Sequence, residues 1–78
     1  MEMKDLVNEI AVKIVDFPEK IEITEIKSEK TSVVELKVAP EDIGIVIGKK
    51  GRMAHAIRNI LEAAAAKLGK RVIFEVIE

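Results

Sequence analysis

The stretch Val46-Ile47-Gly48-Lys49-Lys50-Gly51-Arg52 decides the fold of this 78-residue chain. Two glycines bracket two lysines, and the residues on either side have helical spacing. Glycine lets a backbone turn sharply and come close to a ligand, because it has no Cβ. A loop that leads into a helix N-terminus presents unpaired N–H groups, which attract anions. We interpret the loop as a clamp for a phosphate backbone; a plain turn with solubilising lysines is the alternative.

Helices are predicted on both sides of this loop. Pro40 and the two acidic residues after it start a short helix, because proline suits the first helical position and acids favour the positive end of the dipole. The apolar edge of this helix comprises Ile43, Val46 and Ile47. A second helix is predicted from about Arg52 to Leu68, with Gly69 as its C-cap. Its expected core stripe comprises Met53, Ile57, Ile60, Leu61, Ala64 and Leu68.

The residues before Pro40 predict one further helix and two strands. Apolar residues recur at three- and four-residue steps over Leu6–Val15, and Pro18 stops this helix. A strand that begins at Ile21 alternates apolar and polar residues. We expect a bulge or a frayed end at Ile26, where the alternation breaks. A second strand over residues 33–38 follows a polar turn, which favours an antiparallel hairpin.

A third strand is predicted over residues 71–78, with apolar residues on both of its faces. The helix pair between the second and third strands is long enough to let those strands lie parallel, through a right-handed crossover. The expected order is therefore α-β-β-α-α-β. This is an α+β fold in which three helices pack on a three-stranded mixed sheet. With 78 residues, we expect one domain over residues 1–78.

The charges of the chain are unevenly divided. A net charge of −1 by itself argues against a nucleic-acid binder. Residues 1–42, however, hold 11 acidic and 6 basic side chains, a net of −5, whereas residues 43–78 hold 3 acidic and 7 basic ones, a net of +4. A local basic site can bind phosphates on a nearly neutral protein, because charges are screened beyond about 10 Å at 0.1 M salt.

The residue types present exclude several classes of site. The chain has no cysteine, which excludes disulfides, thiolate zinc sites and a cysteine nucleophile. Its one histidine, His55, has no second ligand or base at metal or triad spacing. The segment Gly44–Lys50 departs from a P-loop, because three residues separate its glycines where four are needed, and a lysine replaces the Ser/Thr that would hold Mg²⁺. We predict no enzyme, no cofactor and no metal site.

No targeting or membrane-spanning segment is predicted. The first five residues are mixed in charge, where a signal peptide needs a basic start followed by an apolar run. The longest apolar stretches are far shorter than the roughly 20 residues of a membrane span. We expect a cytoplasmic protein with no membrane partner.

The loop and the order of elements together resemble the type II KH domain family, in which a G-x-x-G loop lies between two helices. The resemblance covers essentially all of the chain and points to the small single-domain bacterial members. It rests on Val38-Ala39-Pro40-Glu41-Asp42, Gly44, Val46-Ile47-Gly48-Lys49-Lys50-Gly51-Arg52 and Ala56-Ile57-Arg58. One departure is Ala54, where many KH domains carry a larger aliphatic residue; it bears on the depth of the binding groove and not on the fold.

The resemblance implies single-stranded RNA as the partner, with about four nucleotides held and their backbone gripped by the loop. The chain has no Trp, no Tyr and only 2 Phe, so aliphatic contacts with the bases remain. We assign these contacts to Ile43, Gly44 and Ile47, with packing as the alternative for the glycine and a core role for the isoleucines. The RNA-binding residues implied are Gly48, Lys49, Lys50, Gly51, Arg52, Ile43, Gly44, Ile47 and His55.

Three side chains after the loop also have a simpler explanation. Arg52 supports the phosphate clamp or is merely solvated, and His55 contacts RNA or is merely solvated. For Arg58, an ion pair with Glu62 one helical turn later is the favoured interpretation.

We predict an RNA chaperone or post-transcriptional regulator; the alternative is a KH-fold protein-interaction module that acts through a KH-containing partner without direct use of RNA. One small KH domain offers few phosphate contacts, so association would raise its avidity. Members of the family of this kind are associated with self-pairing and with a larger KH-containing protein. We therefore expect a homodimer or a heterodimer, with Met53, Ala54 and Ile57 as anchors beside the loop.

Overall fold

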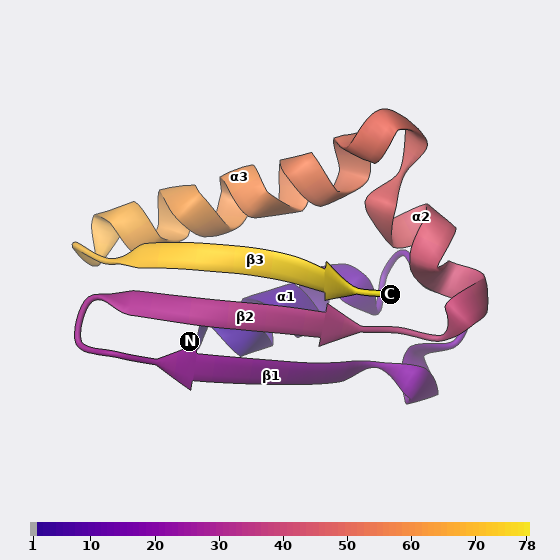
Figure 1. Cartoon of the computed structure of the whole chain (residues 1–78), viewed down its shortest axis with the longest axis horizontal. Helices are drawn as coiled ribbons and strands as arrows, with labels where there is room; N and C mark the ends of the chain where they lie inside the picture. The colour runs from indigo at the N-terminus through magenta and orange to yellow at the C-terminus, as the bar shows by residue number, and fades with distance from the viewer. Residues whose placement is uncertain (1) are drawn as a thin grey trace.

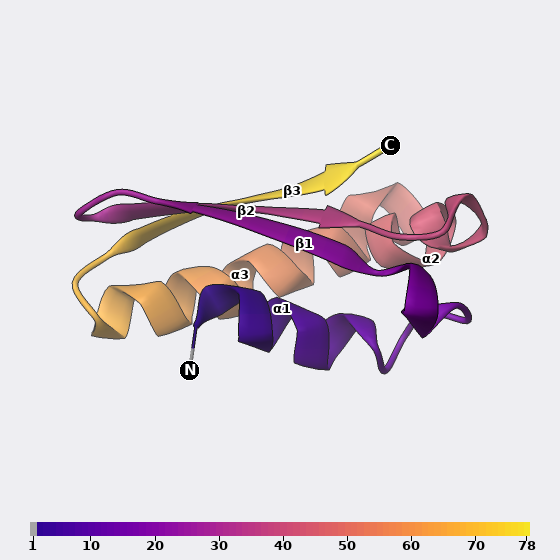
Figure 2. The same ribbon diagram turned by 90° about the horizontal axis from the view of Figure 1, so that it is seen from below.

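Three strands form one mixed sheet, and helices cover one of its faces (Figures 1 and 2). A computed structural model describes residues 2–78. The helices and strands are α1 (Met3–Ala11), β1 (Glu22–Lys27), β2 (Thr31–Lys37), α2 (Ile43–Ile47), α3 (Arg52–Lys67) and β3 (Arg71–Ile77). This order confirms the predicted α-β-β-α-α-β arrangement and the α+β class. None of the helices within residues 2–78 has the length and apolar character needed to cross a bilayer.

The strand order is β1-β2-β3, with β2 antiparallel to β1 and parallel to β3. The predicted hairpin and the predicted parallel pairing are therefore both confirmed. The expected irregularity at Ile26 is wrong, because Ile26 pairs with Val33 in an unbroken register. The alternation breaks there for a different reason. Ile26 points to the uncovered face of the sheet, so it is an apolar residue on the outer side of a regular strand.

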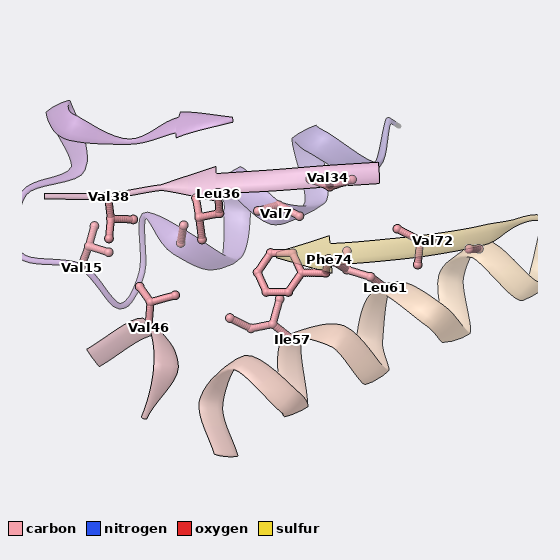
Figure 3. Packing of buried hydrophobic residues seen from close by; sticks show 12 residues of the cluster. Val7, Val15, Val34, Leu36, Val38, Val46, Ile57, Leu61, Val72 and Phe74 are labelled. Carbon is pink, nitrogen blue, oxygen red and sulfur yellow. The ribbon is translucent and has the colours of Figure 1, made fainter. Parts of the chain in front are cut away.

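The core lies between the sheet and the α1–α3 layer (Figure 3). Val34, Leu36 and Phe74 point from the sheet into this layer, where they meet Val7 of α1 and Leu61 of α3, and all five are at most 2% exposed. Burial of side chains of this size stabilises a fold by about 1.5–3 kcal/mol each. The strands at the centre are thus held by the same contacts that fix the two helices.

The predicted boundaries and core stripe need correction in both long helices. Regular α1 ends at Ala11, and turns carry the chain on to a buried Val15, so this helix is shorter than predicted. In α3, only two of the six predicted core residues, Ile57 and Leu61, are buried, and Ala65 joins them. Three of the predicted core residues are exposed instead: Met53, Ile60 and Leu68. The cause is that α3 contacts the sheet and α1 along a single i, i+4, i+8 line, so its second apolar line faces outward.

A buried carboxylate joins the end of the α1 segment to the start of α2. Asp42 is fully buried, and its two oxygens accept hydrogen bonds from the backbone N–H groups of Asp16 and Phe17, both at 3.0 Å. A buried charge is tolerated when hydrogen bonds to it replace its water. Asp42 therefore does more than favour the helix dipole, because it fixes where α2 begins.

Candidate nucleic-acid interface

The loop between α2 and α3 has a backbone conformation that requires glycine at two positions. Gly48 and Gly51 have φ of +78° and +74°. At Gly48, a Cβ would lie 2.6 Å from the Cβ of Met53 and 2.7 Å from the Met53 backbone nitrogen. Such contacts are impossible without a shift of the α3 backbone, so both space and φ require glycine at Gly48. At Gly51 a Cβ would meet nothing within 4 Å, so glycine is required there only by the positive φ.

The two loop lysines lie on the exposed surface of this turn. Lys49 and Lys50 are both exposed, and Lys50 itself has a left-handed φ of +58°. A side chain other than glycine in this region costs roughly 1–2 kcal/mol. The ion pairs within residues 2–78 join Lys13 to Glu9 and Lys27 to Glu2, and neither involves the loop. The loop thus offers two cations that no acidic side chain within residues 2–78 neutralises.

Beside the loop, a shallow hollow of about 490 Å³ opens along the outer surface of α3. It is lined by Lys50, Gly51, Arg52, His55, Ala56, Arg58 and Asn59. No acidic side chain borders it, so anions approach it without local repulsion. The structure therefore brings together four residues of the predicted set, Lys50, Gly51, Arg52 and His55. It also adds Asn59, which no motif in the sequence singled out.

The three predicted groove residues lie on α2, across the loop from this hollow. Ile43 and Ile47 are half-buried, and Ile43 packs against the core. Gly44 is exposed, and a Cβ added there would meet nothing within 4 Å, which argues against the packing role considered for this glycine. An aliphatic surface at the Gly44 position is therefore open to a ligand, while part of each isoleucine is already used by the fold.

Arg58 makes a different contact from the one predicted. Its Nη2 donates a hydrogen bond to the backbone carbonyl of Phe74 in β3, with 3.3 Å between nitrogen and oxygen. The expected ion pair with Glu62 is not formed, because β3 is an edge strand whose outer carbonyls lack a strand partner. Arg58 thereby ties the helix after the loop to the free edge of the sheet. Only the proximity of α3 and β3 in space could have revealed this partner.

Comparison with known proteins gives one consistent result. The family described as KhpA/KhpB, KH domain, matches residues 4–76. RNA-binding protein KhpA of Clostridium acetobutylicum is 51% identical over 75 residues, which are 96% of this chain and 100% of that protein. RNA-binding protein KhpA of Aquifex aeolicus is 50% identical over 76 residues, 97% of this chain and 96% of that protein. The Caldanaerobacter subterraneus protein of the same name is 53% identical over 75 residues, 96% of this chain and 100% of that protein. No solved structure matches the chain.

Proposed function

The chain belongs to the KhpA/KhpB family of KH domains, and on that premise we propose that it binds single-stranded RNA in the cytoplasm as an RNA chaperone or post-transcriptional regulator. The relatives named above are RNA-binding proteins, which supports RNA as the ligand of this chain. The role does not call on catalysis. Base pairing and refolding of RNA are altered by holding single strands apart, and a protein needs no reactive group for that.

The observation that carries this proposal is the Gly48–Gly51 loop. The Gly48 backbone lies too close to Met53 for any side chain, and within residues 2–78 neither of the two exposed loop lysines is in an ion pair. Phosphates are bound by such a combination of positive side chains and close backbone approach. Arg52 and His55 extend the positive surface along α3.

We assign the bases to the α2 side of the loop. Ile43, Gly44 and Ile47 provide an aliphatic surface there, and the open space over Gly44 lets a flat base lie close to the helix backbone. KH domains read unstacked bases, so a duplex of the same length should compete poorly. Equal competition by the duplex would instead indicate a general polyanion surface.

The test is the binding of a fluorescent single-stranded RNA by anisotropy. Lys49→Asp with Lys50→Asp should weaken binding at least about 100-fold, because phosphate contacts supply most of the affinity. The matched control is Lys30→Asp with Lys67→Asp. It makes the same change in net charge at the opposite end of the molecule, in the hairpin turn and the end of α3 (Figure 1). Equal losses in the two double variants would contradict a specific clamp.

An exposed apolar stripe on α3 supports a second function, contact with a KH-containing partner. The anchors expected from the sequence are revised here, because Ile57 is only 2% exposed and Ala54 is half-buried, while Met53 is 37% exposed. The stripe that the structure exposes comprises Met53, Ala56, Ile60 and Ala63. We propose that this stripe binds a larger KH-containing protein, in keeping with a family description that covers both KhpA and KhpB.

Ile60 gives a clean test of the partner proposal, because it is 50% exposed and lies away from the loop. Ile60→Glu should abolish binding to a KhpB-type KH domain in calorimetry and leave the affinity for single-stranded RNA unchanged. Glu62→Ala, on another side of the same helix, is the control and should change neither. If the Ile60→Glu variant binds the partner as tightly as the parent chain does, the exposed stripe is not the binding surface.

A further inference from the structure

The hollow beside the loop distinguishes the two loop lysines. Lys49 and Lys50 are both exposed, but only Lys50 lines the hollow. Lys50 is also the residue with the left-handed φ of +58°. Backbone strain of this kind is concentrated at binding and catalytic sites. Lys50 is therefore the loop lysine whose amine shares a hollow with the other polar side chains beside the loop.

The surroundings of the Lys50 amine favour anionic small molecules. The other polar side chains that line the hollow carry positive charge or can donate hydrogen bonds: Arg52, Arg58, His55 and Asn59. No acidic side chain is among the lining residues. A hollow lined by charges of one sign raises the local concentration of counter-ions and their rate of encounter by roughly 10–10³-fold. A small molecule that carries a phosphate group should therefore collect beside the Lys50 amine.

We propose that Lys50 is a modification site, acylated by small activated acyl donors that carry phosphate, namely acyl phosphates or acyl-CoA thioesters. This inference rests on the phosphate clamp proposed above, because the groups that would hold an RNA phosphate would also hold the phosphate of the donor. The donor and the amine are then brought together without an enzyme. Proximity of this kind converts a bimolecular step into an effectively unimolecular one.

The reaction is the transfer of an acyl group to nitrogen. The neutral Nζ of Lys50 attacks the acyl carbon and forms an N–C bond, while the bond from that carbon to the phosphate oxygen breaks. The phosphate leaves with the bonding electrons, and the proton lost by the nitrogen passes to water. With a thioester, the C–S bond breaks instead and the thiolate leaves. The product is an amide, so the positive charge of Lys50 is removed.

Acylation of Lys50 should regulate the proposed binding of RNA. An acylated Lys50 no longer offers a cation to a phosphate, and its longer neutral side chain stays beside the loop. RNA held by the loop would in turn cover Lys50 and protect it from the donor. The acyl donor and RNA therefore compete for one site, and an increase in phosphate-bearing acyl donors should release RNA from the chain.

Lys20 provides an internal reference for the reaction. It is exposed, as Lys50 is, and it ends the short helical turn η1 (Pro18–Lys20). Two acids, Glu19 and Glu22, lie within two positions of it along the chain. These acids repel a phosphate-bearing donor and do not repel an uncharged one. The ratio of acylation at Lys50 to acylation at Lys20 therefore separates docking of a phosphate from simple accessibility.

The test is quantitative mass spectrometry of the full chain after brief treatment with acetyl phosphate. The Lys50-to-Lys20 ratio should be at least about tenfold greater with acetyl phosphate than with N-hydroxysuccinimidyl acetate, an uncharged reagent. Inorganic phosphate should lower acetylation of Lys50 more than sodium chloride of the same ionic strength does. Arg52→Ala should lower the ratio with acetyl phosphate about threefold or more. Lys37→Ala makes the same change in net charge on β2, outside the hollow, and should leave the ratio unchanged.

A parallel treatment with acetyl-CoA identifies the donor. Selective acetylation of Lys50 by acetyl phosphate alone assigns the site to acyl phosphates, and selective acetylation by acetyl-CoA extends the assignment to thioesters. Two results would overturn the proposal. One is a Lys50-to-Lys20 ratio that is the same for both phosphate-bearing donors and the uncharged reagent. The other is equal protection of Lys50 by phosphate and by chloride.

The regulatory step has its own measurement. Lys50→Gln, which resembles the acetylated side chain, should weaken the binding of single-stranded RNA roughly fivefold at 0.1 M salt, the loss expected for one phosphate contact. Lys50→Arg keeps the charge and should bind as the parent chain does. Equal affinities in the two variants would refute regulation through Lys50. Because the acetylation measurements contain no RNA, a parent chain that fails to bind RNA would refute the proposed function and would leave their result unchanged.

Discussion

Helix α2 has a charged group at each end, and the two are treated in opposite ways. At its start, the Asp42 carboxylate is fully buried, and both of its oxygens are occupied by backbone N–H groups. After its end, Lys49 and Lys50 are exposed and have no acidic partner within the described part of the chain. A charge whose hydrogen bonds are satisfied within the molecule serves stability, whereas a charge left unsatisfied is available to a ligand. Within a few residues this chain does both.

Removal of the buried carboxylate should have the largest effect on stability. Asp42→Ala leaves two backbone N–H groups without acceptors and should lower the free energy of unfolding by about 3 kcal/mol. Urea denaturation followed by circular dichroism measures this loss. Glu41→Ala, which alters the exposed neighbouring acid, should stay within about 0.5 kcal/mol of the parent. Similar losses in the two variants would show that the Asp42 contacts contribute little.

The two loop glycines should differ in their tolerance of a methyl group. Gly48→Ala combines an unfavourable φ with a clash against the Met53 backbone and should cost about 2–3 kcal/mol of unfolding free energy. Gly51→Ala meets only the φ penalty, so its cost should be about 1 kcal/mol. Thermal denaturation of both variants measures the two losses of stability and shows which is larger. A larger loss at Gly51 would mean that the close approach of Gly48 to Met53 is relieved easily.

Two arginines of α3 repeat the comparison on a smaller scale. Arg58 donates to the Phe74 carbonyl and is half-buried, so Arg58→Ala should reduce the free energy of unfolding by about 1 kcal/mol. The Arg52 side chain is exposed and has no ion-pair partner within the described residues, and Arg52→Ala should leave stability unchanged within about 0.5 kcal/mol. Arg52→Ala should instead weaken RNA binding. The result to look for is this crossed pattern in denaturation and anisotropy, and parallel effects would refute it.

The smallest expected change in stability is a gain. Lys50→Gly removes the strain of a left-handed lysine, and after the greater backbone freedom of glycine in the unfolded chain is subtracted, about 0.5 kcal/mol of stabilisation should remain. RNA affinity should fall in the same variant. Its dependence on salt should weaken by roughly 0.7 in the slope of log K against log salt, the value for one phosphate contact on a single strand. Unchanged affinity would exclude a phosphate contact by Lys50.

Those features of the fold that depend on neighbouring residues in the chain could be predicted from the sequence. The order of elements and the buried alternation of Val34 and Leu36 are of this kind, and the structure confirms them. The end of α3 at a glycine is also local, although the C-cap is Leu68 and Gly69, with a left-handed φ of +68°, is the residue after it. Each follows from a period of two or of 3.6, or from a conformation that glycine adopts readily. The loop motif belongs to the same group, because its spacing is local.

The features that could not be predicted depend on contacts between distant residues. Asp42 binds backbone groups 25 and 26 positions earlier, and Arg58 binds a carbonyl 16 positions later. Which of the two apolar lines of α3 is buried depends on the side that the sheet and α1 occupy. Both lines have the same helical periodicity, so the sequence pattern alone does not distinguish the buried line from the exposed one. At Ile26, the break in alternation predicts a backbone irregularity, whereas its cause is an apolar residue on the open face of a regular strand.

The parallel pairing of β2 with β3 has a consequence for how the protein is made. A ribosome synthesises the chain from its N-terminus, so β2, the loop and α3 all emerge before β3. Until β3 docks, β2 presents an unpaired edge, and α3 lacks the strand whose Phe74 fills its core contacts. The proposed phosphate clamp is thus encoded early and assembled late. A nascent chain that stops short of Arg71 would expose an unpaired strand edge, and the loop proposed to bind RNA would precede a helix that lacks part of its core contacts.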